Sequence, residues 1–88
     1  MTNSVNNWYV YIVECADGTL YTGITKDIKR RILEHNYGMK GAKYTRSRRP
    51  VKLLVSWDYE SRSAASIREY QIKKMSRKQK MVLINEKR

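Results

Sequence analysis

The segment Trp8–Thr25, WYVYIVECADGTLYTGIT, decides the fold. Residues 8–15 are rich in aromatic and β-branched side chains, which favour strands. The run ADGT at residues 16–19 interrupts this pattern, which resumes at residues 20–24. Two strand-like runs joined by so short a connection predict an antiparallel β-hairpin.

The length of the hairpin loop decides whether Tyr11 and Tyr21 share a face of the sheet. A two-residue turn would pair Tyr11 with Ile24 and place the two phenols on opposite faces. A three-residue loop with Gly18 in the left-handed conformation would pair Tyr11 with Gly23 and place both phenols on one face. We predict this second register. Gly23, which has no side chain, would then leave room for a phosphate group to approach.

The next segments predict a helix, a loop and a third strand. Asp27 is placed to cap a helix at residues 27–36, whose apolar side chains are Ile28, Ile32 and Leu33. Residues 37–50 contain glycines, a basic run and a final proline, which predict a long exposed loop. Along residues 51–59 an apolar or aromatic side chain recurs at every second position, which predicts a strand. Its buried face would carry Val51, Leu53, Val55, Trp57 and Tyr59.

Two more helices complete the predicted fold. Helical spacing between residues 61 and 75 gives an apolar stripe of Ala64, Ala65, Ile67, Ile72 and Met75. Ser76 and Gln79 fit a capping box that starts a third helix, whose apolar face is Met81, Leu83 and Ile84. We therefore predict an α/β fold: an α+β sandwich with a small three-stranded antiparallel sheet flanked by helices, in the order β-β-α-β-α-α.

Composition limits the chain to one domain. Eighty-eight residues with 41% apolar content suffice for one core, so we predict a single domain over residues 1–88 with its core at 8–84. No apolar run approaches the roughly 18 residues of a membrane span, and the first residues lack a signal-peptide pattern. We therefore expect a cytoplasmic protein without a membrane partner. The only cysteine, Cys15, excludes an intrachain disulfide and a zinc cluster.

The charge predicts a polyanionic partner, because 19 basic residues against 8 acidic ones give +11. Residues 26–49 hold nine basic and two acidic groups, and residues 73–88 hold seven basic groups and one acidic group. If the fold joins these blocks, they form one cationic face for nucleic acid; otherwise they are two separately solvated surfaces. The side chains expected to contact phosphates or bases are Lys43, Tyr44, Arg46, Arg48, Arg49, Lys73 and Lys74.

Three polar side chains lie on or beside the apolar stripes of the predicted helices. Glu69 follows Ala65 by four residues and precedes Ile72 by three, so it projects from the stripe and needs a partner. Arg31 and His35, four residues apart, flank the stripe of the first helix. A salt bridge would also explain Glu69, and a lone histidine is more often a polar residue at the edge of a core.

In their order and spacing these residues resemble the GIY-YIG nuclease domain. The set is Tyr9-Val10-Tyr11, nine residues, Tyr21-Thr22-Gly23, then Asp27-Ile28-Lys29-Arg30-Arg31 and a glutamate on a later helix. The chain resembles in particular the small stand-alone members that read YxGxTxDxxxRxxxHN, and also the N-terminal nuclease domain of the bacterial excision-repair incision subunit. Tyr9 stands where the first motif has glycine, and Thr22 where the second has isoleucine.

The resemblance implies a metal-dependent endonuclease, with DNA as the expected substrate and a role in DNA repair or recombination. It implies one divalent metal ion, Mg²⁺ or alternatively Mn²⁺, held by Glu69 as the one protein carboxylate. Arg31 corresponds to the arginine aimed at the scissile phosphate. Tyr11 and Tyr21 correspond to the motif tyrosines, of which one accepts the proton of the attacking water and the other orients the water or the phosphate. His35 corresponds to an accessory proton carrier or a phosphate ligand.

Two other function classes use the same basic residues without catalysis. They are a non-catalytic nucleic-acid-binding module and a ribosome-associated RNA-binding protein. Asp58 and Glu60 could form a carboxylate pair, but they fit a solvated strand end better. As an enzyme, the chain would be weakly specific or would depend on a targeting protein partner.

Overall fold

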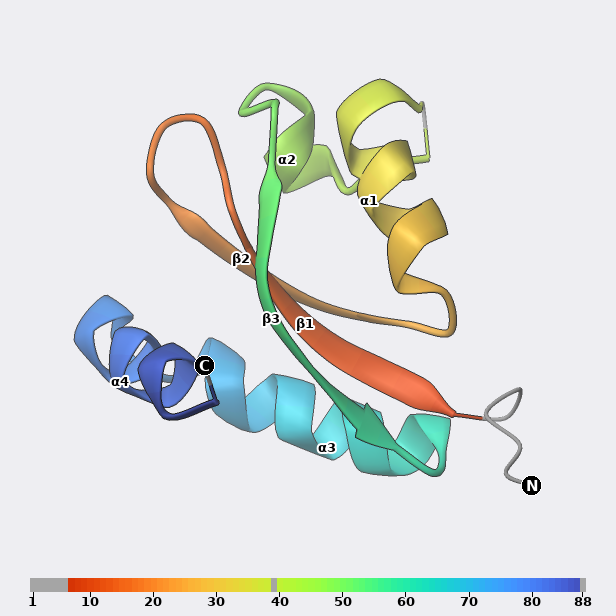
Figure 1. Cartoon of the computed structure of the whole chain (residues 1–88), viewed down its shortest axis with the longest axis vertical. Helices are drawn as coiled ribbons and strands as arrows, with labels where there is room; N and C mark the ends of the chain where they lie inside the picture. Colours follow the sequence, from red (N-terminus) through yellow and green to blue (C-terminus); the bar gives the residue numbers. More distant parts are fainter. Residues whose placement is uncertain (1–6, 39, 88) are drawn as a thin grey trace.

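The computed structural model of the chain describes residues 7–38 and 40–87, so residues 1–6, 39 and 88 of the predicted domain lie outside the described part (Figure 1). The elements are β1 (Trp8–Glu14), β2 (Leu20–Thr25), α1 (Ile28–Tyr37), α2 (Lys43–Arg46), β3 (Lys52–Tyr59), α3 (Arg62–Lys73) and α4 (Arg77–Lys87). The predicted order is confirmed, except that the short helix α2 lies within the expected loop. In the described ranges no helix combines the length and apolar character that crossing a bilayer requires.

The three strands form an antiparallel sheet in the order β2-β1-β3. In the hairpin, Tyr11 pairs with Gly23 and Val13 pairs with Tyr21. Gly18 in the connecting loop has a φ of 85°, in the left-handed region that glycine adopts without strain. The predicted register is therefore confirmed, and both phenols lie on one face of the sheet.

A register shift interrupts the pairing of β1 with β3. Ile12 pairs with Val55 but Val13 pairs with Leu53, so Leu54 is an extra residue in β3. An extra residue reverses the alternation of side chains beyond it. Leu54 accordingly packs against the core and Leu53 is 38% exposed. The prediction that Leu53 lies on the buried face is wrong for this reason.

Each face of the sheet has its own core. Figure 1 shows α3 and α4 on one side of the sheet and α1 and α2 on the other. The buried residues of the core between the sheet and the helices α3 and α4 are Val10, Ile12, Val55, Ala65, Ile72 and Ile84. The buried residues of the smaller core on the α1 side are Tyr11, Val13, Cys15 and Val51. Successive residues of β1 point to opposite faces, which is why Tyr11 faces α1 while its neighbours face α3.

Side-chain caps fix where the helices begin. Asp27 accepts a hydrogen bond from the Arg30 amide (3.1 Å), and Ser61 caps α3 in the same way. Ser76 accepts from the Gln79 amide (3.1 Å), and the Gln79 side chain accepts from the Ser76 amide (2.8 Å). The predicted start of α1 and the predicted capping box of α4 are confirmed.

Two apolar residues assigned to the helix stripes are exposed instead. Leu33 is 59% exposed and Ile67 is 61% exposed. A helix turns about 100° per residue, so Leu33 lies on the far side of α1 from the buried His35, and Ile67 lies away from the buried Ile72 of α3. Their assignment to the core is wrong because each helix packs against the sheet along one narrow stripe.

Candidate active site

Three rings meet on the face of the sheet covered by α1. Tyr11 comes from β1, Tyr21 from β2 and His35 from α1. The ring centroids are 6.4 Å apart for the two tyrosines, 5.8 Å for Tyr11 and His35, and 5.4 Å for Tyr21 and His35. The hairpin register puts the phenols on one face, and α1 adds the imidazole. Three of the five predicted catalytic residues therefore form one cluster, which we call the ring cluster.

Gly23 lies directly beneath the Tyr11 ring. A Cβ atom at this position would stand 2.5 Å from Tyr11 Oη and 2.7 Å from Tyr11 Cζ, closer than such atoms approach. The Tyr11 side chain fills the space expected to admit a phosphate, so that prediction is wrong. The absence of a side chain at Gly23 lets the phenol lie across β2 and reach His35.

A chain of hydrogen bonds runs from Tyr11 into α2. Tyr11 Oη lies 2.8 Å from His35 Nε2, and His35 Nδ1 lies 2.8 Å from Thr45 Oγ1. The Thr45 hydroxyl donates to the Ala42 carbonyl oxygen at 3.0 Å, so its oxygen is left to accept from Nδ1. A neutral imidazole that carries its proton on Nδ1 has an unprotonated Nε2, which accepts from Tyr11. The Tyr11 oxygen therefore keeps its lone pairs for other partners.

Burial keeps both members of this pair uncharged at neutral pH. His35 is fully buried, and burial together with the charge of Arg31 lowers its pKa to about 4. Burial also raises the pKa of Tyr11 to about 12, although a hydrogen bond with Arg31 acts in the opposite direction. The interpretations of His35 as a polar residue at the core edge or as a direct phosphate ligand do not fit a ring with no exposed surface.

Arg31 borders the ring cluster. Its Nη1 donates to Glu34 Oε1 at 2.9 Å and to the Lys40 carbonyl oxygen at 2.8 Å. The guanidinium also acts on the pKa of Tyr11, which places its charge beside that phenol. The Arg31 side chain is 23% exposed, so a ligand can still reach it.

Glu69 approaches the ring cluster from α3. Its side chain is 21% exposed, and its Oε2 lies 3.3 Å from Lys73 Nζ. Lys73 Nζ in turn lies 5.8 Å from the centre of the Tyr21 ring. After burial, the charge of Glu69 is among the influences that raise the pKa of Tyr11. The structure thus brings the five predicted catalytic residues into one neighbourhood, with Glu69 connected through Lys73.

The donor set around Glu69 is sparse. Among residues 7–38 and 40–87, no group of three or more His, Cys, Asp or Glu side chains could hold a metal ion. A metal here would have Glu69 as its protein carboxylate, with water and substrate oxygens completing its shell. Mg²⁺ is commonly bound through one or two carboxylates, several waters and substrate phosphates, so the residues present fit a hydrated Mg²⁺.

Comparison with known proteins identifies the family. Residues 7–82 match the GIY-YIG catalytic domain. The chain belongs to the GIY-YIG family. GIY-YIG domains are in general nucleases, so membership implies nucleic-acid binding and supports a nuclease function.

Individual relatives of this GIY-YIG chain cover most of its length. It is 61% identical over 77 residues to a UPF0213 protein of Desulfotalea psychrophila, covering 88% of this chain and 70% of that one. It is 54% identical over 78 residues to a UPF0213 protein of Staphylococcus saprophyticus, covering 89% of this chain and 94% of that one. The solution NMR structure of a UPF0213 protein from Bacillus halodurans matches with a TM-score of 0.60 and 48% identity, covering 92% of this chain and 85% of that one.

Two arginines of this GIY-YIG domain that were expected to contact nucleic acid bind other parts of the protein. Arg48 donates to Asp17 Oδ2 (3.0 Å) and to the Tyr44 carbonyl oxygen (2.8 Å). Arg49 donates to the His35 carbonyl oxygen (2.6 Å) at the end of α1. Both guanidinium groups therefore fix the segment around α2, and their contact with phosphate stays a prediction.

The other predicted contacts lie on the surface of the protein. Lys43 and Arg46 are exposed at the two ends of α2. Tyr44, between them, is 40% exposed and stacks on Tyr21 with 5.9 Å between centroids. Lys74 lies 4.7 Å from the ring of an exposed tyrosine of α3. Their contact with nucleic acid stays a prediction.

The two basic blocks meet at the hairpin from opposite sides of the sheet. Residues 26–38 and 40–49 form α1, α2 and their connections on one side, and residues 73–87 form the end of α3 and α4 on the other (Figure 1). Arg48 binds Asp17 from the first block, and Arg77 Nη1 donates to the Gly18 carbonyl oxygen (2.5 Å) from the second. The two blocks therefore adjoin at the hairpin edge of the sheet, and their use as one nucleic-acid-binding surface stays a prediction.

Sequence reasoning missed two residues that hold the site. Thr45 is fully buried against His35, yet it sits in a polar and basic segment with no local signal of burial. Asn36 accepts from the Val51 amide (2.6 Å) and donates to the Val51 carbonyl oxygen (3.1 Å), which ties α1 to the residue before β3. A signal for Asn36 was present, since it is the last residue of the motif YxGxTxDxxxRxxxHN.

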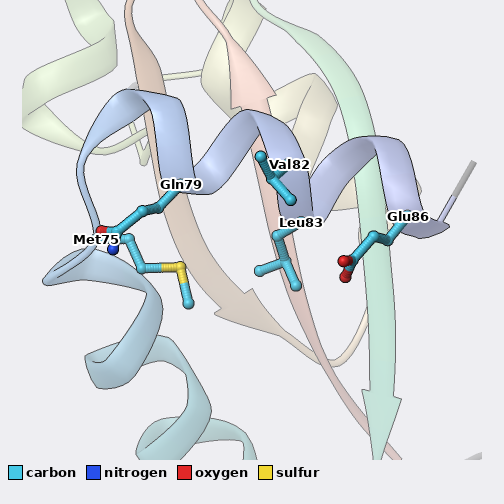
Figure 2. Close-up of a pocket in the computed structure, with 5 residues that line it drawn as sticks. All are labelled: Met75, Gln79, Val82, Leu83 and Glu86. Atoms are coloured by element: carbon cyan, nitrogen blue, oxygen red, sulfur yellow. The ribbon is translucent and has the colours of Figure 1, made fainter.

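An apolar groove lies between the end of α3 and α4 (Figure 2). Its volume is about 320 Å³, and its lining residues are Met75, Gln79, Val82, Leu83 and Glu86. Figure 2 shows the side chains of Met75 and Leu83 turned into it. The residues that line this groove include no cationic side chain.

Proposed function

We propose that this GIY-YIG domain is a metal-dependent endonuclease that hydrolyses phosphodiester bonds, with DNA as its substrate. The observation that carries the proposal is the hydrogen bond from Tyr11 to a buried, neutral His35, with Arg31 and Tyr21 beside it. A surface that only bound nucleic acid would need cations and exposed rings, but a proton acceptor behind a phenol would add nothing to it. DNA rests on the similarity to the excision-repair incision domain.

Tyr11 is proposed as the group that accepts the proton of the attacking water. Its own hydrogen points to His35 Nε2, so its oxygen presents lone pairs to the site. As the phenol takes a proton from water, it releases its own proton to Nε2 of His35. His35 is then protonated, and Tyr11 is neutral again. Thr45 Oγ1 accepts from Nδ1 throughout and keeps the ring in the required orientation.

Without a ligand this pair is held inactive. Burial raises the pKa of Tyr11 to about 12 and lowers that of His35 to about 4, so the buried imidazole is a weak proton acceptor. The transfer therefore needs additional positive charge near the phenol oxygen and the attacking water. Arg31 supplies one such charge beside Tyr11, and its remaining N–H donors suit two phosphate oxygens.

Glu69 is proposed to hold the divalent metal ion, Mg²⁺ or Mn²⁺. When bound, such an ion stabilises charge that develops on the phosphate and lowers the pKa of coordinated water. Lys73, which pairs with Glu69 and faces Tyr21, keeps a second cation at the same edge of the ring cluster. Tyr21 completes the site by orienting the water or the phosphate opposite Tyr11.

The test is cleavage of a labelled panel of single-stranded, duplex, flap and branched DNA and of RNA, with Mg²⁺, Mn²⁺ or EDTA. Wild type is expected to cut only with metal, and Glu69→Ala to bind without cutting. Glu60→Ala is the matched control, because it removes the same charge from an exposed residue after β3. Metal-dependent cutting by Glu69→Ala would contradict the assignment of Glu69. Binding without cutting by wild type would favour the non-catalytic nucleic-acid-binding module.

A further inference from the structure

A second hollow lies between the hairpin and α4, outside the ring cluster. Its volume is about 210 Å³, and it is lined by Thr19, Leu20, Arg77 and Lys80. We call it the hairpin pocket. Arg77 and Lys80 are three residues apart in α4, so both side chains lie on the same face of the helix. Two cations therefore converge on one small cavity.

Arg77 is held in place by the hairpin. Its Nη1 donates to the Gly18 carbonyl oxygen at 2.5 Å, which orients the guanidinium against the loop. A guanidinium has five N–H donors in a fixed fork, so four remain for a ligand after this bond. The same fork matches the oxygens of a phosphate group.

Lys80 brings a partly desolvated charge to the hairpin pocket. Burial, followed by the positive charge of Lys73, lowers its pKa. No ion pair within 4.0 Å in the described ranges includes Lys80 or Arg77. A half-buried cation without a counter-ion is unfavourable, and an anion in the pocket would relieve this cost.

Lys73 connects this pocket to the ring cluster. Its ammonium stands 5.8 Å from the centre of the Tyr21 ring, and its charge acts on Lys80. Tyr21 and Leu20 are neighbours on β2, which is an edge strand of the sheet. Cations therefore follow the β2 edge from the ring cluster to the hairpin pocket, which is the arrangement that a phosphodiester backbone requires.

We propose that the hairpin pocket binds a phosphate group of the nucleic-acid strand, at a fixed distance along the strand from the phosphodiester bond that the ring cluster cleaves. The proposal rests on the proposed function. It assigns Arg77 and Lys80 to positioning the strand, and it makes the pocket a determinant of where the strand is cut.

The first experiment measures binding of a labelled single-stranded DNA oligonucleotide in EDTA, so that no cleavage interferes. Lys80→Met removes the charge and keeps the aliphatic stem, and Lys78→Met makes the same change at an exposed residue outside the pocket. Lys80→Met is expected to raise Kd about tenfold and to reduce the slope of log Kd against log salt by about one. Lys78→Met is expected to change Kd by no more than about twofold.

A second experiment locates the phosphate. Neutral methylphosphonate linkages are placed at one position of the oligonucleotide at a time. In wild type, a neutral linkage at one position is expected to weaken binding about tenfold, and that effect is expected to disappear in Lys80→Met. Arg77→Lys, which keeps the charge but loses the fork, should show an intermediate loss. Thermal unfolding of each variant shows that the fold is intact.

The outcomes separate the pocket from the catalytic site. If Lys80→Met and Lys78→Met bind alike, or if the methylphosphonate effect persists in Lys80→Met, the pocket assignment is overturned even when cleavage occurs. If the position-specific effect is found but wild type never cuts with metal, the pocket stands and the nuclease proposal fails. If wild type binds no oligonucleotide, the pocket assignment is also overturned.

Discussion

Acid should destabilise this protein through its one histidine. His35 has a pKa of about 4 in the folded state against 6.5 when unperturbed. At a pH between 4 and 6.5, the unfolded chain therefore binds a proton that the folded chain does not bind. Stability therefore rises with pH in this window. The contribution is fully present above about pH 6.5 and is lost as the pH falls towards 4. A shift from 6.5 to about 4 corresponds to about 3 kcal/mol.

Urea unfolding at several pH values between 4 and 7 measures this loss. The fluorescence of Trp8 and Trp57, which pack against the core under α3, reports the transition. For wild type, the free energy of unfolding should fall by about 1 kcal/mol per pH unit near pH 5. His35→Gln lacks the titrating ring, so its curve should be flatter by that amount. Carboxylates that titrate in acid, such as Glu34, are present in both proteins and cancel in the comparison.

Two results would contradict a buried, neutral His35. Parallel pH curves for wild type and His35→Gln would mean that His35 does not resist protonation in the folded state. An NMR titration of the ring offers a direct check, since no other histidine contributes signals. A midpoint near 6.5 in the folded protein would contradict the buried, neutral ring, whereas we expect a midpoint near 4 with the proton on Nδ1.

Four further substitutions probe the supports of the site and the fold. Gly23→Ala should reduce stability by about 1–3 kcal/mol and lower the cleavage rate, because the new Cβ would stand 2.5 Å from Tyr11 Oη. Gly18→Ala is the control, because a Cβ at Gly18 would meet nothing within 4 Å; it should cost only about 1 kcal/mol, owing to the positive φ. If urea unfolding shows the same loss of stability for Gly18→Ala and Gly23→Ala, the close contact at Gly23 is contradicted. Thr45→Val should leave the Nδ1 proton of His35 without an acceptor and lower the free energy of unfolding by about 1–3 kcal/mol. An unchanged ¹⁵N spectrum of the His35 ring in this variant would contradict the assigned proton position. Ser76→Ala should lower the free energy of unfolding by about 1 kcal/mol, since it removes one half of a capping box, and wild-type stability would show that the cap contributes nothing.

Local rules account for the parts of the fold that could be predicted from the sequence. Gly18 is the residue that can take the left-handed conformation in the hairpin loop, and this conformation sets the register that places Tyr11 and Tyr21 together. Asp27 and Ser76 mark helix starts through hydrogen bonds that span only three residues. Because these interactions lie within short segments, the sequence around each residue is sufficient to indicate them.

The parts that could not be predicted depend on contacts between distant segments. The extra residue Leu54 arises from the pairing of β3 with β1, which no pattern within residues 51–59 reveals. His35 is buried because α2 packs over it and Thr45 accepts its Nδ1 proton, and α2 lies in a segment whose composition is that of a loop. The basic blocks lie on opposite sides of the sheet because the chain crosses it through β3. Spacing along the chain identified Tyr11 and His35, but their bond to each other comes from tertiary packing.

The proton transfer from Tyr11 to His35 is tested most directly by the single-turnover cleavage rate of Tyr11→Phe on the best substrate of the panel. Tyr37→Phe is the control, because it removes a phenol hydroxyl from a residue of α1 that is 81% exposed. We predict that Tyr11→Phe lowers the rate about 100-fold or more with unchanged Kd, while Tyr37→Phe cuts like wild type. Cleavage by Tyr11→Phe at the wild-type rate would contradict the proposal that the bonded pair of Tyr11 and His35 carries the proton.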